Sequence, residues 1–537
     1  MYKTTDGLEY ENIVNELLPV KIFDLVNISE PENLLKVKST VCSSQLSDCS
    51  IFKGKGARIV LDFGKEICGG VRIITRACPE SVRMRLTFGE SVSEALSDLG
   101  DKNSCNDHSP RDLVISVSTM SDLNYGQTGF RFLKIEALDD KVVYMQTICA
   151  VSVMPNFTSR VTLKTNDTLL NKIIDTAIYT AEVNCQRGYI WDGIKRDRLV
   201  WCGDLNPEIL TLLYSFGDVS NIRNSLDFLY SDKTDSLWIN NIPSYSAWWV
   251  INFCDYVRLT GNTEYFLSRK NTALEILGQF DSNISKSGDM QFGNKTDLVF
   301  FLDWPTYGSE DAVIGTGALI CYAAKKFAEY EKSDTCDSLL KKLSIYLEKQ
   351  AVSKQVRAFQ ILAGSKRNGD ADFLEKNGAE GFSTFMAYYI LSADYLAGGK
   401  NMLSIIKEYY GGMLSKGATT FWEDFDISWL KLSSSIDRLP KKGEKDIHAD
   451  FGNYCYKGLR HSLCHGWSSG VAAFIFERVL GLSFDRENNE IIIKPNLMGL
   501  KELEATIPFS GETVTISIKG NEIKTDSPNI VIVKPEL

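Results

Sequence analysis

The stretch Thr165–Cys185, TNDTLLNKIIDTAIYTAEVNC, marks the point at which the apolar pattern of the chain changes from a period of two to a period of three to four. Polar capping residues stand at its start and apolar residues follow at helical spacing. The capping residues are Asn166, Asp167 and Thr168, and the apolar residues are Leu169, Leu170, Ile173, Ile174, Ala177, Ile178 and Ala181. We therefore expect a helix here, and with it the start of a helical domain.

The segments on either side of this helix have different patterns. Upstream, from about residue 58 to 160, short alternating or β-branched runs such as ARIVLDFG and FRFLKIEAL are separated by Gly, Asn and Asp, which predicts an antiparallel β-sandwich. The first fifty or so residues are ambiguous, and an extra strand with a linking segment is one interpretation. Downstream, amphipathic segments recur roughly a dozen times over about three hundred residues. Short alternating runs then return in IIIKP, TVTISIKG and NIVIVKP.

This order of β, then α, then β segments predicts a multidomain α plus β protein and not a parallel α/β sheet. We expect an N-terminal β-sandwich with its leading segment over residues 1–160. A helical domain follows over residues 161–478, where the alternation of short and long loops suits a barrel of helical hairpins. A small β-domain closes the chain over residues 479–537.

Charge and composition exclude several classes of partner. The chain of 537 residues has a formal net charge of -10, so neither a nucleic acid nor an anionic membrane would be attracted electrostatically. No window reaches the roughly eighteen consecutive apolar residues that a membrane span needs. The first twenty residues have no apolar run that fits a signal peptide, and the thirteen cysteines have no repeated spacing. These features favour reduced thiols and a cytoplasmic location, and a homodimer is compatible with them.

One sequence match to serine hydrolases is rejected. GWSSG, Gly466–Gly470, fits the Gly-x-Ser-x-Gly nucleophile elbow with Ser468 as the nucleophile, but that family order needs a histidine after the serine. All four histidines of the chain precede Ser468. An esterase is therefore disfavoured.

Metal and cofactor sites also lack support in the sequence. His461, Cys464 and His465 have i, i+3 and i+4 spacing, which on a helix would present ligands to a metal, but a core or pocket histidine is the simpler interpretation because no other metal-binding pattern accompanies them. GTGALI, from Gly315, lacks the third glycine and the preceding strand of a dinucleotide site, and there is no Walker loop. We expect neither a metal nor an organic cofactor.

Two acidic, aromatic loops can supply the paired carboxylates that glycosidic bond cleavage requires, one to protonate the leaving oxygen and one to attack or to activate water. The first loop is WDGIKRDRLVWCGD, Trp191–Asp204, in which three aspartates are set among arginines and tryptophans. The second is GATTFWEDFD, Gly417–Asp426, in which Glu423 and Asp424 follow Trp422. Both fall between helical segments, so a helical barrel can gather them at one rim. Tryptophan offers a flat apolar surface to a sugar ring and, by excluding water, raises the pKa of a neighbouring acid.

Taken together, DGIKRDRLVWCGD, FLDWP from Phe301, GATTFWEDFD and RHSLCHGWSSG resemble the α-L-rhamnosidases of glycoside hydrolase family 78. The resemblance spans nearly the whole chain, and the C-terminal module of the family is echoed by IIIKPNLMGLKELEATIPFSGETVTI. It implies an (α/α)6 helical barrel of the six-hairpin glycosidase superfamily, flanked by an N-terminal β-sandwich and a small C-terminal β-sandwich domain. It also implies an inverting reaction that releases terminal α-L-rhamnose.

The resemblance assigns roles to particular residues. Asp197 takes the general-acid position and Glu423 that of the general base. Further residues are expected at the substrate: Asp192, Arg196, Trp201 and Asp204 of the first loop, Asp303 and Trp304 of FLDWP, and Trp249, Trp422, His465 and Trp467. Among these, Trp249 lies in the helical pattern SYSAWWVINF beside Trp248, so at least one of the two is expected in the core.

The sequence departs from the family at the acid position. The family commonly has glutamate where this chain has Asp197, whose side chain is shorter by about one carbon–carbon bond. A displacement of about 1 Å can cost roughly a hundredfold in rate. Asp192 or Asp204 therefore remains an alternative proton donor. A carbohydrate-binding homologue without activity, or a glycosidase for another sugar, remains an alternative function, and the N-terminal β-domain is interpreted as structural support.

Overall fold

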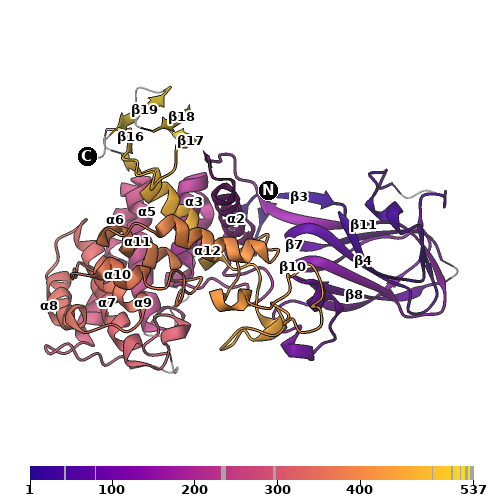
Figure 1. Ribbon diagram of the computed structural model, residues 1–537, viewed down its shortest axis with the longest axis horizontal. Helices are drawn as coiled ribbons and strands as arrows, with labels where there is room; N and C mark the ends of the chain where they lie inside the picture. The colour runs from indigo at the N-terminus through magenta and orange to yellow at the C-terminus, as the bar shows by residue number, and fades with distance from the viewer. Residues whose placement is uncertain are drawn as a thin grey trace.

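A computed structural model describes the chain except residues 6, 42–43, 79, 232–237, 294–297, 487, 510–511, 521, 527–529 and 533–537. Its helices form a body that lies beside a large N-terminal β-domain, and a small C-terminal β-domain sits over one end of the helical body (Figure 1). The multidomain α plus β architecture expected from the sequence is confirmed. No helix in the described ranges is both long and apolar enough to cross a membrane.

The N-terminal domain contains a nine-stranded antiparallel sheet, ordered β5-β6-β11-β7-β10-β8-β9, with β3 on β11 and β4 on β7. Its three long strands are β7, β10 and β11, and β7 pairs with the other two. The strands are β3 (Asn12–Leu17), β4 (Lys21–Val26), β5 (Ile28–Ser29), β6 (Ser50–Lys53), β7 (Arg58–Ala77), β8 (Val82–Gly89), β9 (Asp112–Val117), β10 (Asp122–Ala137) and β11 (Val142–Pro155). β1 (Tyr2–Lys3) and β2 (Glu9–Tyr10) form a separate pair, and α1 (Val92–Leu96) follows β8. The domain has a core of its own, so it packs as a unit. The ambiguous first fifty residues thus hold five short strands.

The helical domain begins where the sequence pattern changes. In α2 (Thr168–Asn184) the Asp167 carboxylate accepts a hydrogen bond from the Leu170 N–H at 3.0 Å, which satisfies one free amide of the first turn. The predicted apolar face is buried, except that Leu169 points to solvent. Capping and amphipathicity therefore locate this helix correctly.

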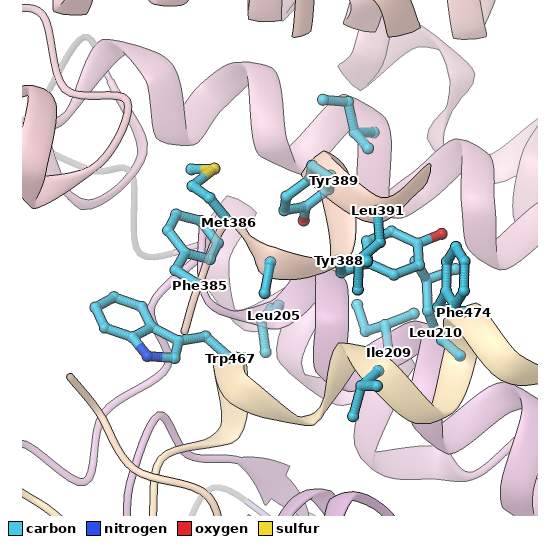
Figure 2. Close-up of a cluster of buried hydrophobic side chains, with 14 of the residues drawn as sticks. Leu205, Ile209, Leu210, Phe385, Met386, Tyr388, Tyr389, Leu391, Trp467 and Phe474 are labelled. Carbon is cyan, nitrogen blue, oxygen red and sulfur yellow. The ribbon is translucent and has the colours of Figure 1, made fainter. Parts of the chain in front are cut away.

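Eleven further α-helices follow among the described residues: α3 (Leu205–Phe216), α4 (Ser220–Ser231), α5 (Pro243–Thr260), α6 (Thr263–Ser282), α7 (Glu310–Ala328), α8 (Asp334–Glu348), α9 (Lys354–Leu362), α10 (Asp370–Glu375), α11 (Ala387–Ala397), α12 (Met402–Ser415) and α13 (Gly470–Phe474), which continues as a π-helix over Ile475–Val479. Helix α9 is buried on nearly every side, and α10 has only six residues. Figure 2 shows how α3, α11 and α13 meet: Leu205 and Ile209 lie near Tyr388, Tyr389 and Phe474.

The C-terminal domain has two sheets, ordered β12-β17-β18-β19 and β15-β16-β20. The strands are β12 (Thr162–Thr165), β15 (Leu482–Asp485), β16 (Glu490–Ile493), β17 (Glu502–Phe509), β18 (Glu512–Lys519), β19 (Glu522–Thr525) and β20 (Ile530–Ile532). β12 pairs with β17 although it precedes the barrel in the chain. The predicted boundary at residue 161 thus assigns β12 to the barrel, whereas its hydrogen bonds belong to the C-terminal sheet.

The segment between α12 and α13 connects the barrel to the N-terminal domain. The Arg131 guanidinium on β10 donates to the Gly417 carbonyl at 3.0 Å, and the Thr419 hydroxyl accepts from the Glu66 N–H at 2.9 Å. Farther along, Lys102 pairs with Asp450. The loop that carries Glu423 is therefore held between two domains.

Candidate active site

The first acidic loop is fixed by its own backbone and by one aspartate. The Asp192 carboxylate accepts from the Leu199 N–H at 2.8 Å, and the Asp192 N–H donates to the Leu199 carbonyl at 2.9 Å. Between them, Asp197 and Arg198 have φ of 55° and 59°, in the left-handed region that aspartate and asparagine enter more readily than most residues. This sharp turn projects Arg196 and Asp197 away from the loop base.

One guanidinium joins the two loops. The Arg196 side chain donates to Asp197 Oδ1 at 3.2 Å and also forms an ion pair with Glu423 Oε1. Arg196 and Glu423 are buried, and Asp197 is partly exposed. Residues 197 and 423, which are 226 positions apart in the sequence, thus bring their carboxylates to the two terminal nitrogens of one guanidinium. Two hydrogen bonds of about 3 Å around a guanidinium separate two carboxylate oxygens by at most roughly 8 Å.

Glu423 is held on its other side by backbone groups. Its Oε2 accepts from the Ser462 N–H at 3.1 Å, and its N–H donates to the Ser462 carbonyl at 3.0 Å. Its carbonyl accepts from Trp467 Nε1 at 2.9 Å and from the Thr384 hydroxyl at 2.6 Å. These four contacts fix the carboxylate in position before any ligand binds.

Asp204, at the end of the first loop, contacts His465. The imidazole Nε2 lies 3.1 Å from Asp204 Oδ2, and the Tyr245 hydroxyl donates to Oδ1 at 3.2 Å. Burial raises the pKa of Asp192 well above its usual range, and the nearby carboxylates of Asp197 and Asp204 add to this shift. Burial likewise raises the pKa of Glu208 below them. Ionised and protonated carboxyl groups can therefore coexist in this region.

Two sets of side chains have spacing that suits a metal ion. Ligand atoms of Asp192, Asp204 and His465 lie within 4.8 Å of one another. The donor atoms of this set already have partners within the protein, since Asp204 Oδ2 lies 3.1 Å from His465 Nε2 and Asp192 Oδ1 accepts from the Leu199 N–H at 2.8 Å. The other set, Glu90, Glu94 and His448, is occupied by the ammonium group of Lys195.

The predicted residues Asp303 and Trp304 lie next to an aromatic group that reaches Arg196. Asp303 accepts from the Trp304 N–H at 2.9 Å and from the Ser383 hydroxyl at 2.6 Å. The Trp304 ring is stacked on Tyr454, with centroids 5.4 Å apart, and meets Tyr456 edge-on at 6.2 Å. The Arg196 guanidinium lies 5.8 Å from the centre of the Tyr456 ring. An aromatic group therefore connects Trp304 to the two acidic loops.

Asp424 next to the candidate base yields a pH prediction. Burial, with smaller effects from Asp303 and Asp426, raises the pKa of Asp424 from 3.8 to about 7. The native state then binds this proton more tightly than the unfolded state, so the free energy of unfolding should fall as pH rises from about 4 to about 7. The Asp424→Asn variant should lose that slope, a difference on the order of 3 kcal/mol between pH 5 and pH 8. Urea unfolding at pH 5 and pH 8 measures it. The exposed Asp372→Asn variant on α10 is the control, and an unchanged slope in Asp424→Asn would contradict the expectation.

Two of the tryptophans predicted at the substrate lie in the interior. Trp249 is fully buried in α5, where its ring is stacked on Phe253 at 5.5 Å and its Nε1 donates to the Leu226 carbonyl at 3.0 Å. Trp248 is also buried, so both rings are in the core. Trp422 has no exposed surface and meets Phe425 edge-on. The assignment of Trp249 to the substrate is wrong, because helical periodicity does not say which neighbour covers a ring, and Trp422 contributes through packing beside Glu423.

Trp249 provides a test of this correction. The Trp249→Phe variant leaves a void and removes the hydrogen bond to the Leu226 carbonyl, so it should lower the free energy of unfolding by about 1–3 kcal/mol. KM for a glycoside should stay within about twofold, since the ring touches no ligand space. Thermal unfolding and steady-state kinetics check both values. Trp304→Phe should instead raise KM and change the free energy of unfolding less. A tenfold rise in KM for Trp249→Phe would restore the assignment of Trp249 to the substrate.

The remaining predicted aromatic residues lie at the acidic loops. Trp201, partly exposed, donates from Nε1 to Asp197 Oδ2 at 3.3 Å. Trp467 is stacked on Phe385 at 5.1 Å, as Figure 2 shows, while its Nε1 holds the Glu423 carbonyl. Its neighbour Ser468 is fully buried and donates to the His465 carbonyl, so it is not an exposed nucleophile. Residues 461–465 are irregular and not helical, so the i, i+3, i+4 spacing presents no ligand face.

The site also contains residues that were not expected at the substrate, although His461 stands in the quoted motif RHSLCHGWSSG. His108, from the N-terminal domain, places Nε2 at 3.4 Å from Asp197 Oδ1. His461 Nε2 accepts from the Asp424 N–H at 2.8 Å. Tyr245 and Tyr456 reach the site from a buried helix and from an irregular loop. Each comes near the acidic loops only through the tertiary structure.

A groove of about 1110 Å³ shares no lining residue with these loops. It lies between the linker Pro155–Val161, the segment Leu213–Asn221 at the end of α3, and Phe484 and Arg486. Neither Asp197 nor Glu423 reaches it. The candidate active site is therefore the junction of the two acidic loops.

Comparison with solved structures identifies the architecture. The structure is similar to a rhamnosidase of glycoside hydrolase family 78 from Bacillus sp. GL1, with a TM-score of 0.73 and 18% identity over 94% of this chain. The fold is that of the α-L-rhamnosidases. A rhamnosidase from Klebsiella oxytoca with rhamnose bound gives a TM-score of 0.68 at 18% identity over 87% of this chain, and the α-L-rhamnosidase of Streptomyces avermitilis complexed with L-rhamnose gives 0.66 at 12% over 95%.

The chain spans only part of the length of several of these relatives. The chain spans 56% of the Bacillus protein and 48% of the Streptomyces protein, but 96% of the Klebsiella protein. No family model and no curated protein sequence matches it. At such identities the similarity establishes the fold, and the substrate and mechanism depend on the residues of the site.

Proposed function

We propose that this protein is an inverting, exo-acting glycoside hydrolase that releases terminal α-L-rhamnose from a glycan or glycoside. The observation that carries the proposal is the Arg196 guanidinium, which contacts the carboxylates of both Asp197 and Glu423. Inverting enzymes keep their two carboxyl groups roughly 6.5–9.5 Å apart to leave space for a water, whereas retaining enzymes hold them at about 5–5.5 Å. The contacts of both carboxylates with one guanidinium set an upper limit of roughly 8 Å on their separation, which is compatible with the inverting range.

In this mechanism Asp197 donates a proton to the glycosidic oxygen while Glu423 takes a proton from water on the opposite face of the ring. The bond from the anomeric carbon to the leaving oxygen breaks as the bond to the water oxygen forms. Arg196 must leave the space between the two carboxylates when the sugar enters. Its Nε, which is buried without a hydrogen-bond partner, then has a sugar hydroxyl to bind.

Other unpaired polar atoms support a hydroxyl-rich ligand. His465 Nδ1 and Asp424 Oδ2 are buried and have no partner among the described residues, and each would be satisfied by a hydroxyl group or by water. Trp201 and Trp304 keep part of their rings accessible, so they can pack against the C–H face of a pyranose. The rhamnose in the Klebsiella and Streptomyces structures makes L-rhamnose the first sugar to test.

One observation favours a second candidate, a carbohydrate-binding homologue without turnover. Arg196 and Trp201 both donate to Asp197, and His108 lies 3.4 Å from it, so the carboxylate accepts hydrogen bonds on both oxygens. A general acid must instead carry a proton when the substrate is bound. If the sugar does not displace these donors, the pocket binds and does not cleave.

A panel of chromogenic glycosides separates the two candidates. The hydrolase should release aglycone from a 4-nitrophenyl α-L-rhamnoside, and NMR of the first-formed sugar should show the β-anomer. A retained α-anomer would contradict the inverting mechanism, and cleavage of a different glycoside alone would reassign the sugar. Binding of L-rhamnose by calorimetry, with no hydrolysis, would establish the second candidate.

A further inference from the structure

The N-terminal β-domain reaches the site through a buried glutamate. Glu90 follows the last residue of β8, and Ser91 after it caps α1. β8 is paired on both sides, with β9 and β10, so the position of Glu90 is set by a rigid sheet. Glu90 has no exposed surface, and neither the reaction nor the family resemblance accounts for it.

Glu90 holds the same dipeptide that holds Glu423. Glu90 Oε2 accepts from the Leu463 N–H at 2.7 Å, and Oε1 accepts from the Ser462 hydroxyl at 3.3 Å. From the other side, Glu423 Oε2 accepts from the Ser462 N–H at 3.1 Å. Two glutamates from two domains thus hold residues 462 and 463 between them.

Lys195 connects Glu90 to the first acidic loop. Its ammonium group lies 2.9 Å from Glu90 Oε2 and 3.2 Å from Glu94 Oε1. It also donates to the carbonyls of Leu459 at 3.1 Å and His461 at 2.6 Å. Every proton of this buried cation therefore has a partner, and all of those partners belong to the N-terminal domain or to the segment around residue 460.

These contacts close a ring. Glu90 contacts Ser462 and Leu463, Ser462 contacts Glu423, Glu423 contacts Arg196, and the next residue back, Lys195, returns to Glu90. We propose that Glu90 is a positioning residue for Glu423, so that the N-terminal β-domain is a working part of the active site and not only structural support. This inference rests on the proposed hydrolase function.

An alternative is that Glu90 only fastens two domains together. In that case its loss would lower stability and leave the chemistry of the folded enzyme intact. A positioning role has a different signature, because a shift of about 1 Å in a catalytic group can cost roughly a hundredfold in rate. The two roles are therefore distinguished by kcat at a temperature where the variant is fully folded.

The test compares Glu90→Gln with Asp112→Asn. Both substitutions are nearly isosteric and neutralise a buried carboxylate of the N-terminal domain; Asp112 pairs with Arg85 and lies outside the contact ring. We expect Glu90→Gln to lower kcat by about 10- to 100-fold while KM changes less than about threefold. The loss should be the same for 2,4-dinitrophenyl and 4-methylumbelliferyl α-L-rhamnoside, because water activation by Glu423 does not depend on the leaving group. Asp112→Asn should retain the wild-type kcat.

A double variant sharpens the comparison. Removing both partners of a buried ion pair is often less destabilising than removing one, so Glu90→Gln with Lys195→Met should regain thermal stability relative to Lys195→Met alone. A positioning role predicts that kcat stays low in the double variant despite this gain. Recovery of kcat together with stability, or a loss of kcat in Glu90→Gln no larger than that of Asp112→Asn, would overturn the inference.

A second measurement does not depend on turnover. Hydrogen exchange of peptides that cover residues 459–465 and 421–424 should be faster in Glu90→Gln than in Asp112→Asn, because the Leu463 and Ser462 amides lose their fixed acceptors. If exchange is faster in Glu90→Gln but the wild-type protein hydrolyses no glycoside, the proposed function is disproved and the positional coupling is retained. Unchanged exchange would disprove the coupling, whatever the activity.

Discussion

Replacing Glu423 with glutamine is expected to lower kcat for an aryl α-L-rhamnoside by about 10²- to 10⁴-fold, the usual contribution of a general base. The amide cannot accept a proton from water. It still offers an oxygen to Arg196, so the ion pair becomes a hydrogen bond from the charged guanidinium to a neutral amide, and the loop 417–426 should keep its place. KM should change little, since the group acts on water. Steady-state kinetics near neutral pH measure the effect.

The matched control is Glu348→Gln, the same substitution at an exposed position of α8. It should leave kcat unchanged. Circular dichroism and thermal unfolding of Glu423→Gln establish that the variant is folded. If Glu423→Gln keeps more than about a tenth of the wild-type kcat, Glu423 is not the base, and Asp424 becomes the residue to test.

The Asp197→Asn variant is expected to lose most activity on substrates whose leaving group must be protonated before it departs. For a 4-methylumbelliferyl or alkyl rhamnoside, we expect kcat to fall by about 10²- to 10⁴-fold. For 2,4-dinitrophenyl α-L-rhamnoside the loss should be less than about tenfold, because this leaving group departs as an anion. Asparagine tolerates the positive φ of residue 197 as well as aspartate does, so the turn should be preserved.

The parallel variant Asp192→Asn addresses the alternative donor. Burial raises the pKa of Asp192, which keeps a proton available at that carboxyl. If the leaving-group dependence appears in Asp192→Asn and is missing in Asp197→Asn, Asp192 is the acid. An equal loss for all leaving groups in Asp197→Asn would indicate a role in sugar binding.

The left-handed turn also bears on the departure from the family. Glutamate commonly occupies the acid position, and aspartate enters the left-handed region more readily than longer side chains do. The geometry of residues 197 and 198 therefore gives a physical reason for the shorter acid here.

Local pattern predicted much of this protein. The change of period at Thr165–Cys185 located the first helix of the barrel, because burial on one face of a helix leaves its spacing in the sequence. The same reasoning separated the β, α and β regions. It also selected the loops of Asp197 and Glu423 as candidates, since each places carboxylates beside a tryptophan and glycosidic cleavage requires two carboxyl groups.

The tertiary structure decided what lies far apart along the chain. Periodicity could not say that Trp249 faces the core or that β12 joins β17, because the covering partner of a buried face and the partner of a strand are not written in local spacing. Nor could it bring Arg196 to Glu423, or Glu90 and His108 from the β-domain to the barrel. Those contacts arise only when separate cores dock, since hydrogen bonds and ion pairs depend on distance in space and not on separation in sequence.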